Sequence, residues 1–412
     1  MPLSEHAVSN NIFHPNQHGF RAGLSTCTNL LAAYDIVTKH LENHTPVDVL
    51  YIDFQKAFDR IQYSLLFDKL SKYHFPKILV KWLANFLTGR KQAVVVDGCA
   101  SAWKDVTSGV PQGTIIAPFL FNVFVADMFS LELHSSLFCF ADDTKLVFPF
   151  VQEFSLQEDL DLICKWANSN GMIINPTKSG LIHFGRTNRK IALRISNEFL
   201  PSNNYYKDLG ILIESDLSFS AHVISCASKA SVISRLILHS FSRTNPSLLV
   251  NCFKIYVMPL LLYGIPFFNP RYGKDIDILE NVQRKFTKSL CGPKLRHLSY
   301  LDRLKAFSLE PVELSFLRLR LVHLFKIVRF PNQLKCLLPP FHASVTRGHA
   351  LRVSLPCVNS EIRKQYFPIS LLAIWNSLPQ AIVSSHSASS FVKGLIHLDL
   401  SLFLLGRALK KS

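Results

Sequence analysis

The segment that constrains the fold most is FCFADDTKLVF, residues 138–148, in which two carboxylates stand between two apolar arms. Apolar arms of this length joined by a short polar pair predict a hairpin of two buried strands, with Asp142 and Asp143 at its turn. Adjacent carboxylates repel each other, and burial makes the repulsion stronger. A bound divalent cation removes that repulsion, whereas in the simpler alternative both side chains of the turn lie in water.

A third carboxylate is predicted at the end of another buried strand. VDVLYIDFQKAFD, residues 47–59, opens with an apolar run from Val47 to Phe54 that is interrupted only by Asp48 and Asp53, which predicts a buried strand that ends at Asp53. Three carboxylates at strand ends of one sheet can hold two metal ions about 3.5–4 Å apart, which clamp the attacking and leaving oxygens of a phosphoryl displacement. Because Mg²⁺ prefers oxygen ligands, the sequence predicts magnesium here.

The remaining pattern predicts an α+β protein in its first half and a helical second half. Strands alternate with helices up to about residue 220, and KQAVVVDG predicts a strand followed by a turn at Asp97 and Gly98. YYKDLGILIESDLSF, residues 205–219, predicts a pair of strands around a polar turn. Residues 221–330 are mostly helical, and the chain becomes irregular from residue 331. We therefore expect boundaries at 46/47, 220/221 and 330/331.

Positive charge is concentrated in the second half of the 412-residue chain, whose net charge is +16. Residues 226–412 contain 26 Lys and Arg against 8 Asp and Glu, whereas residues 1–225 contain 19 against 21. Such an imbalance favours a polyanionic partner, nucleic acid before membrane, over a role in solubility alone.

Two features place the chain inside a cell and away from a membrane. None of the nine cysteines forms a CxxC pair, which predicts reduced thiols. The most apolar stretch, residues 248–268, contains Asn251, Lys254, Pro259 and Pro266, and therefore predicts buried helix and turn. A membrane protein remains an alternative on this stretch alone.

Several motifs together resemble a known family. YIDFQKAFD (51–59), SGVPQG (108–113) before an apolar helix, and FADDTKL (140–146) have the order and spacing of the reverse transcriptase palm. With QHGFR (17–21), KDLGILIESDLSFSAHV (207–223) and WNSLP (375–379), the set resembles reverse transcriptases of non-LTR (LINE-type) retrotransposons. The resemblance implies a right-hand polymerase. Its parts would be partial fingers over 1–46, a palm with inserted finger helices over 47–220, a helical thumb over 221–330 and a basic extension over 331–412. The start of the fingers and an endonuclease would be absent from this chain.

The resemblance also implies roles for individual residues. Asp53, Asp142 and Asp143 would bind two Mg²⁺ ions, with Mn²⁺ as a possible substitute, and Lys178 would assist the departure of pyrophosphate. The substrate-binding residues would be Arg21, Phe54, Phe58, Gly109, Pro111, Gln112 and Gly113. Phe58 would exclude a ribose 2′-OH, the glycines would let the backbone approach the nucleotide, and Arg21 would contact template or triphosphate. Leu209 and Gly210 would form the turn that holds the primer end.

The activity that the resemblance implies is RNA-directed DNA synthesis on an RNA template from a DNA primer and dNTPs, in the nucleus. Basic residues of the predicted thumb would follow the backbone of the RNA–DNA hybrid: Lys229, Arg235, Arg243, Lys254, Lys285, Lys288, Lys294 and Arg296. Two alternatives remain. One is an inactive, truncated reverse-transcriptase remnant that only binds nucleic acid. The other is an RNA-dependent RNA polymerase, against which Phe58 argues.

Overall fold

A computed structural model describes residues 2–150, 155–241, 245–291, 297–330, 334, 337–340 and 349–405. The chain forms two compact units, residues 1–204 and 205–412, and each is described here by itself. The first unit mixes sheet and helix and the second is mainly helical, so the predicted mixed α+β character is confirmed. The boundary between the two units lies at 204/205 along the chain, whereas the sequence pattern predicts the corresponding boundary at 220/221.

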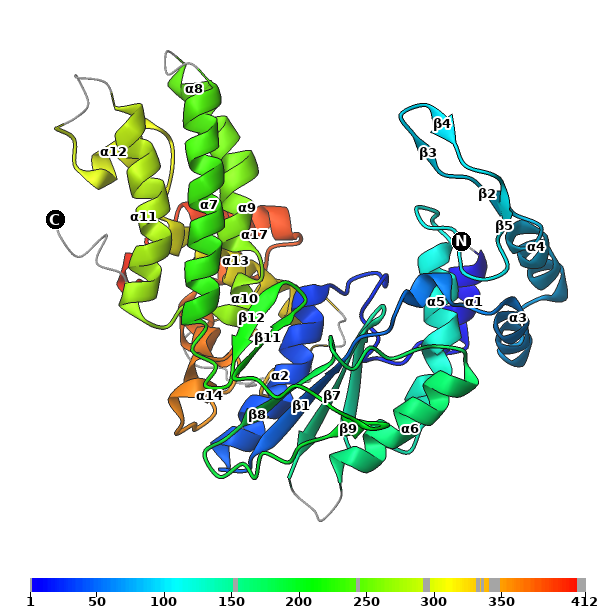
Figure 1. Cartoon of the computed structure of the whole chain (residues 1–412). Coiled ribbons are helices and arrows are strands. Elements are labelled where there is room, and N and C mark those ends of the chain that lie inside the picture. Colours follow the sequence, from blue (N-terminus) through cyan, green and yellow to red (C-terminus); the bar gives the residue numbers. More distant parts are fainter. Residues whose placement is uncertain are drawn as a thin grey trace. The chain divides into compact units, whose positions relative to one another are not determined.

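A four-stranded antiparallel sheet forms the centre of the first unit (Figure 1). Its order is β6-β7-β1-β8, with β6 at Ser136–Phe140, β7 at Asp143–Pro149, β1 at Val47–Ile52 and β8 at Gly180–Phe184. The predicted hairpin over 138–148 is therefore present. Its two-residue turn is Ala141 and Asp142, so the expectation that both aspartates form the turn is wrong. Phe140 pairs with Asp143, which makes Asp143 the first residue of β7.

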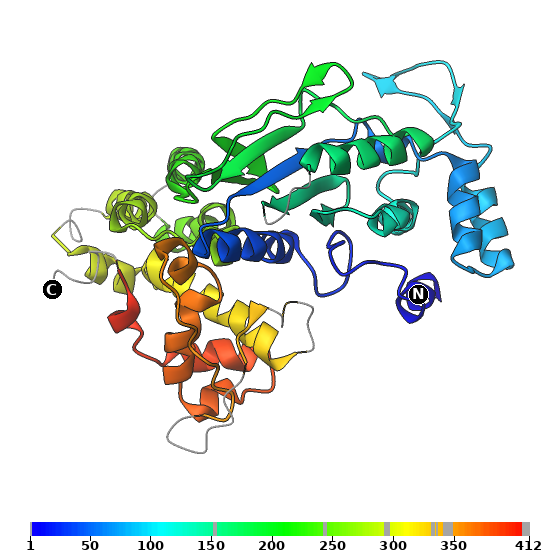
Figure 2. The same ribbon diagram turned by 90° about the horizontal axis from the view of Figure 1, so that it is seen from below.

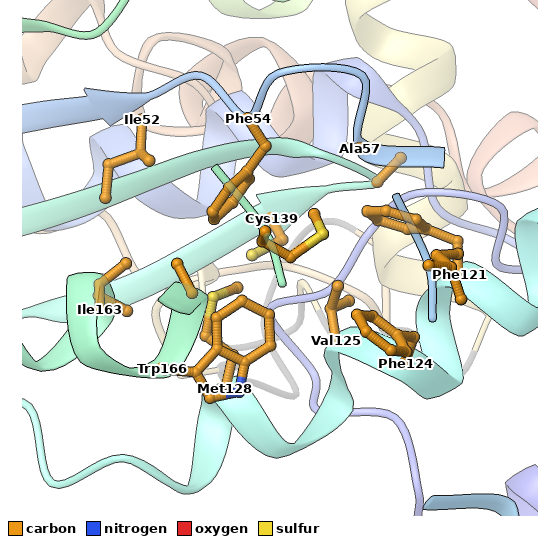
Figure 3. Packing of buried hydrophobic residues seen from close by; sticks show 14 of the residues in the cluster. Ile52, Phe54, Ala57, Phe121, Phe124, Val125, Met128, Cys139, Ile163 and Trp166 are labelled. Carbon is orange, nitrogen blue, oxygen red and sulfur yellow. The ribbon is translucent and has the colours of Figure 1, made fainter. Parts of the chain in front are cut away.

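Helices cover both faces of this sheet because its central strand is apolar on both sides. Along β1, Leu50 and Ile52 pack into the core formed by α5 (Ala117–Val125) and α6 (Leu156–Ser169). Tyr51 points the other way, and its hydroxyl contacts that of Tyr34 on α2 (Thr26–Glu42). Seen from below, α2 in dark blue and α6 in green lie on opposite sides of the sheet (Figure 2). Figure 3 shows the core on the α6 side.

The other elements of the first unit flank this centre. Its further helices are α1 (Pro2–Ser9), η1 (Ala57–Asp59), α3 (Tyr63–Lys72), α4 (Lys77–Leu87) and η2 (Ala126–Ser130). Its short strands are β2 (Lys91–Gln92), β3 (Val95–Val96), β4 (Cys99–Ala100), β5 (Lys104–Asp105), β9 (Arg194–Ile195) and β10 (Glu198–Phe199). The turn predicted at Asp97 and Gly98 joins β3 to β4, and both residues have positive φ.

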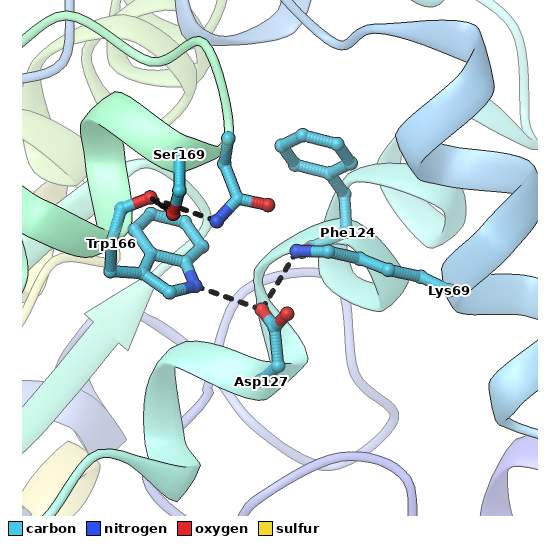
Figure 4. Close-up of polar contacts among 6 residues, drawn as sticks. Lys69, Phe124, Asp127, Trp166 and Ser169 are labelled. Atoms are coloured by element: carbon cyan, nitrogen blue, oxygen red, sulfur yellow. Dashed lines mark hydrogen bonds and ion pairs between the residues drawn. The ribbon is translucent and has the colours of Figure 1, made fainter.

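A buried lysine of α3 connects this helix to α5, η2 and α6 (Figure 4). Lys69 of α3 donates to the Phe124 carbonyl at 2.6 Å and to Asp127 Oδ1 at 2.8 Å, and the same carboxylate oxygen accepts from Trp166 Nε1 at 3.0 Å. The ammonium also lies 4.4 Å from the centre of the Phe124 ring and 5.3 Å from that of Trp166. Burial lowers the pKa of Lys69, while the Asp127 carboxylate raises it. The charge is thus held by one carboxylate, one carbonyl and two rings.

The second unit begins with the predicted strand pair, β11 (Tyr205–Asp208) and β12 (Ile211–Glu214). Its longer helices are α7 (Ser220–Ser240), α11 (Gly273–Leu290) and α13 (Val312–Arg329). The shorter ones are α8 (Pro246–Cys252), η3 (Phe253–Val257), α9 (Met258–Leu262), α10 (Ile265–Phe268), α12 (Tyr300–Ala306), α14 (Glu361–Gln365), η6 (Ile369–Leu371), α15 (Leu372–Ser377), α16 (Gln380–Val383), α17 (Ala388–Ile396) and η7 (Ser401–Phe403). Helix α7 packs on α11 and α9, and α13 packs on α10 and α17.

The apolar stretch over 248–268 is divided among four short helical segments. Pro259 has no N–H to donate to the Ile255 carbonyl, and the preceding turn widens into the π-helical η3, where Met258 N–H bonds to the Phe253 carbonyl. Among the described helices, α7 is long and apolar enough to cross a membrane by length and composition alone. It packs against α11 within the second unit.

Candidate active site

Asp53 and the aspartates of the β6–β7 hairpin lie at the same end of the two central strands, β1 and β7. The last paired residues of β1 and β7 are Ile52 and Thr144, so Asp53 follows on one strand at the level where Asp143 precedes on the other. The Asp53 backbone is held on its other side, because its N–H donates to Ser179 Oγ at 3.1 Å and its carbonyl accepts from Asn175 N–H at 2.8 Å. Asp53 is therefore fixed between the β6–β7 hairpin and the residues that precede β8.

The electrostatics of the turn show that Asp53 and Asp142 are neighbours. Asp142 is half-buried, and its pKa is raised, first by this burial and then by the negative charge of Asp53, against the effect of a backbone hydrogen bond. A carboxylate whose ionisation is disfavoured in this way is a suitable ligand for a divalent cation, which holds it in the charged form.

The predicted convergence of three carboxylates is not seen. Within the described part of the chain, no group of three His, Cys, Asp or Glu side chains could hold a metal ion, and Asp143 is exposed at the start of β7. Its position follows from the hairpin, because the turn consists of Ala141 and Asp142. Two carboxylates are nevertheless enough for Mg²⁺, which usually keeps several waters and takes one or two protein carboxylates plus phosphate oxygens of the substrate. Asp53 and Asp142 therefore fit the metal chemistry that the sequence predicts.

The QHGF segment packs against the hairpin turn formed by Ala141 and Asp142. Gln17 is buried and pairs with Cys139 of β6, and its Oε1 accepts from Gly19 N–H at 3.0 Å and from Ala141 N–H at 3.2 Å. Gly19 lies against the same turn, so closely that a Cβ there would be 2.2 Å from the Ala141 nitrogen. Gln17 and Gly19 thus position Asp142 without being predicted site residues themselves. The only signal in the sequence was their place in the QHGFR block.

The two predicted phenylalanines have different environments. Phe58 in η1 is half-buried and stacks on Phe121, with ring centres 4.4 Å apart and an angle of 16°, while Phe20 contacts its edge. The Phe58 ring is therefore held in place by these contacts, and part of its surface stays exposed to solvent. Phe54, in contrast, is buried and packs edge-on against Trp166 in the core (Figure 3). The structure places the Phe54 side chain where it cannot touch a substrate, so its prediction as a binding residue is corrected to a packing role.

The loop over 108–113 is anchored to η1. Gly109 has φ +81°, its N–H donates to the Ile61 carbonyl at 2.8 Å, and a Cβ there would lie 2.7 Å from Asp59 Cα. Its lack of a side chain is therefore used for close packing on the protein's own backbone, rather than for an approach to substrate. Gln112 is exposed and donates to Asp59 Oδ1 at 3.1 Å.

The rest of this loop is more open. Pro111 is half-buried, and Gly113, with φ +83°, has no atom within 4 Å of the place where its Cβ would be. Gly113 is thus the glycine of the loop that leaves room for another molecule.

The two predicted basic residues of the site lie on opposite flanks. The Arg21 guanidinium donates from Nη1 to the His14 carbonyl at 2.6 Å and to the Gln17 carbonyl at 3.0 Å, and burial lowers the pKa of this group. It therefore organises the loop that carries Gln17. Lys178 is exposed and directly precedes Ser179, whose hydroxyl bonds to Asp53 N–H. Lys178 lies at the corner that Asp53 occupies.

The turn predicted to hold the primer belongs to the second unit. Leu209 and Gly210 form the two-residue turn between β11 and β12, with φ of 44° and 85°. Tyr263 donates from its hydroxyl to the Leu209 carbonyl at 2.7 Å, and its ring is 3.2 Å from where a Gly210 Cβ would be. The turn of Leu209 and Gly210 thus packs closely against the Tyr263 side chain.

The basic residues predicted to follow a hybrid are on the surface wherever the structure describes them. These exposed residues are Lys229 and Arg235 on α7, Lys254 on η3, and Lys285 and Lys288 on α11. Arg243, Lys294 and Arg296 lie outside the described residues. Exposed lysine and arginine side chains on helices are suited to phosphate contacts that carry no sequence information.

Comparison with known proteins decides the family. Residues 2–213 match the family described as reverse transcriptase (RNA-dependent DNA polymerase), which is more than half of the chain. The chain belongs to the reverse transcriptase family. The resemblance predicted from the sequence motifs is thereby confirmed.

Several relatives of this reverse transcriptase come from transposable elements. It is 28% identical over 291 residues to "RNA-directed DNA polymerase from mobile element jockey" of Drosophila funebris, covering 67% of this chain and 32% of the relative. It is also 28% identical over 289 residues to the probable RNA-directed DNA polymerase from transposon X-element of Drosophila melanogaster, with the same shares. The chain thus spans about a third of the length of the curated relatives it matches. An apo telomerase structure from Candida tropicalis has a TM-score of 0.42 and 11% identity, covering 78% of this chain and 58% of the telomerase chain. We draw no conclusion from that likeness.

Proposed function

We propose that this chain is an RNA-directed DNA polymerase of a non-LTR retrotransposon, which adds deoxynucleotides to the 3′-OH of a primer. The observation that carries the proposal is the proximity of Asp53, which follows β1, to the hairpin turn before β7 that carries Asp142, in a chain that belongs to the reverse transcriptase family. Reverse transcriptases use divalent metal in general, and the raised pKa of Asp142 beside Asp53 supports a metal site at these two carboxylates.

The finer proposal is that two Mg²⁺ ions, or Mn²⁺ in their place, bind here when the substrates are present. Asp53 and Asp142 would hold them, together with waters and phosphate oxygens of the substrate. Metal ions in such a site stabilise negative charge on the phosphate oxygens of the nucleotide. The residues of the chain supply the rest: the Gln17 amide and the Gly19 backbone hold the turn so that Asp142 stays close to Asp53.

Side chains around the carboxylates would select and position the nucleotide. The Phe58 ring, held by Phe121, would occupy the space that a ribose 2′-OH needs, and so would favour dNTPs over rNTPs. Gln112 at the exposed tip of its loop can donate or accept through its amide, and the neighbouring Gly113 leaves room for a base pair. Lys178 would supply positive charge to the departing pyrophosphate from the corner next to Asp53.

We also propose the polymerase names for the regions of the chain. Residues 1–46 would be partial fingers, 47–220 the palm, 221–330 the thumb and 331–412 a basic extension. Exposed basic residues on α7 and α11 support contacts between the thumb and an RNA template paired with a DNA primer. Nuclear localisation is proposed from the family, and imaging of the tagged chain in cells tests it.

Primer extension tests the proposal. The full chain is given poly(rA) with an oligo(dT) primer, dTTP and Mg²⁺, and the length of the product is measured. We expect extension that Asp142→Ala abolishes, while Asp68→Ala, which removes an exposed carboxylate of α3, leaves it intact. Binding of the hybrid without any extension supports the alternative of a remnant that only binds nucleic acid. Extension with rUTP as efficient as with dTTP supports an RNA polymerase.

A further inference from the structure

A buried arginine of the second unit faces a cavity of about 230 Å³. Arg320 lies in the middle of α13, a helix that is buried mostly through apolar side chains, and only 8% of its surface is exposed. The cavity wall also includes Ser370 of η6, Asn269 after α10, and Lys364 of α14. All of these elements belong to the same unit.

The charge of Arg320 has little compensation from the protein. Its one described hydrogen bond runs from Nη2 to Ser370 Oγ, at 2.5 Å, and its buried Nε has no partner in the described structure. Among the described residues, no carboxylate forms an ion pair with Arg320, although Arg318 on the same helix pairs with Glu310. Burial alone lowers the pKa of Arg320 to about 9, so the group stays charged at neutral pH. A buried charge of this kind costs several kcal/mol unless a partner is supplied, on the order of the penalties known for buried ions.

The other polar groups of the cavity are already engaged elsewhere. Ser370 Oγ donates to the Tyr366 carbonyl at 3.4 Å, which leaves its lone pairs facing the guanidinium. Asn269 Nδ2 donates to the Gln365 carbonyl at 3.3 Å. Lys364 is partly exposed and pairs with Glu361 at 2.9 Å, so it lies toward the solvent side of the cavity.

One carboxylate also lines the cavity, and it limits the charge of any ligand. Glu313, at the start of α13, accepts the backbone N–H of Leu405, so its carboxylate is oriented toward that chain segment. Lys364 already pairs with Glu361, so Arg320 is the uncommitted positive charge of the wall, set against Glu313. An arginine fork matches the two oxygens of a phosphate or carboxylate group.

We propose that this cavity is a phosphate-binding site anchored by Arg320, and that its ligand is the phosphate group of a nucleotide or nucleic acid. The basic composition of residues 226–412, with 26 Lys and Arg against 8 Asp and Glu, favours phosphate over carboxylate ligands. This site lies outside the carboxylate centre, and its existence does not depend on polymerase activity.

Thermal unfolding of the full chain tests the site, with inorganic phosphate added at constant ionic strength. We compare the wild type with Arg320→Met, which keeps the volume but removes the charge. The control is Arg329→Met, which removes an exposed charge from the end of the same helix. We expect phosphate to raise the melting temperature of the wild type and of Arg329→Met. Arg320→Met should bind phosphate about 10-fold to 100-fold more weakly, as expected for lost hydrogen bonds to a charged group.

The same variants separate a ligand site from a structural role. If Arg320 serves as a ligand site, Arg320→Met should melt at the same or a higher temperature than the wild type when both are measured without phosphate. The reason is that a buried uncompensated charge has been removed. A lower melting temperature, with an unchanged response to phosphate, means that Arg320 is structural and overturns the proposal. An equal response of all three proteins to phosphate overturns it as well.

Oligonucleotides identify the source of the phosphate. A short RNA with a 5′-phosphate is compared with the same RNA carrying a 5′-OH, in binding to wild type and Arg320→Met. Loss of affinity in the variant for the 5′-phosphate RNA alone identifies a terminal phosphate, and equal loss for both identifies an internal phosphodiester. If the variant loses affinity for inorganic phosphate but binds both RNAs as the wild type does, the ligand is a free mononucleotide or phosphate. If the variant binds phosphate and both RNAs as the wild type does, the proposal fails.

Discussion

Gly19 controls the position of the catalytic turn, and Gly19→Ala should therefore reduce catalysis strongly. The added Cβ would lie 2.2 Å from the Ala141 nitrogen and 3.0 Å from the Ala141 Cα and the Phe140 carbonyl carbon. All three atoms belong to the backbone, so no side chain can turn aside to relieve the contact. The hairpin turn that carries Asp142 has to move instead.

The size of the effect follows from the geometry. An ordinary contact needs more than 3 Å, so the turn has to retreat by about 1 Å, and a misplacement of this size can lower a catalytic rate about 100-fold. Overpacking of a core position costs about 1–3 kcal/mol of unfolding free energy. In a unit of about 200 residues, each kcal/mol corresponds to a fall in melting temperature of about 2–4 °C.

Steady-state primer extension provides the measurement, with Gly23→Ala as the matched control. Gly23 has φ +77° and no atom within 4 Å of its Cβ position, so alanine there introduces backbone strain of about 1 kcal/mol without a collision. We expect kcat of Gly19→Ala to fall about 100-fold with little change in hybrid binding, while Gly23→Ala keeps its kcat. Normal kcat in Gly19→Ala, with both proteins folded, would refute the coupling between the QHGF segment and Asp142.

Three further predictions concern other residues of the first unit. The raised pKa of Asp142 means that the metal-free folded state binds its proton more tightly than the unfolded state does. The contribution of this proton to the free energy of unfolding is therefore lost as pH rises from about 4 through the raised pKa. Asp142→Asn should reduce this loss in melting curves recorded with chelator. Phe58→Ala should raise the kcat/KM for rUTP relative to dTTP by at least about tenfold, whereas an unchanged ratio would mean that the ring does not contact the sugar. Lys69→Met removes the donor shared by the Phe124 carbonyl and Asp127, and should lower the unfolding free energy by about 1–3 kcal/mol in urea titrations; an unchanged midpoint would contradict the role of this cluster.

The parts of the site that the sequence predicted are those that depend on local pattern. The apolar run that ends at Asp53 and the apolar arms around the aspartate pair both indicated buried strands, and neighbouring strand ends lie together in a sheet. Asp53 and Asp142 could therefore be expected to meet. The exposed position of Asp143 could not, because it depends on a two-residue turn with Ala141 in the left-handed region. A non-glycine residue with positive φ is set by tertiary contacts rather than by its own preference.

The residues whose roles the sequence did not identify correctly, or did not separate from one another, depend on long-range contacts. Gln17 reaches a backbone amide 124 positions away, and its buried amide resembles any polar residue of an irregular segment. Phe54 and Phe58 are both aromatic and four positions apart, and only packing shows that the first belongs to the core and the second to the site. Arg320 is one of many basic residues in its half of the chain, and only its cavity distinguishes it.

The central claim is that Asp53 and Asp142 bind the same divalent metal. Mn²⁺ binding tests it directly: electron paramagnetic resonance measures free Mn²⁺ in titrations of the full chain with an RNA–DNA hybrid and a dNTP that cannot be incorporated. The account predicts that Asp53→Asn and Asp142→Asn each weaken the same binding step and that the double variant is little worse than either single one, while Asp68→Ala binds as the wild type does. Separate and additive losses from the two variants, or wild-type binding in either of them, would contradict a shared metal.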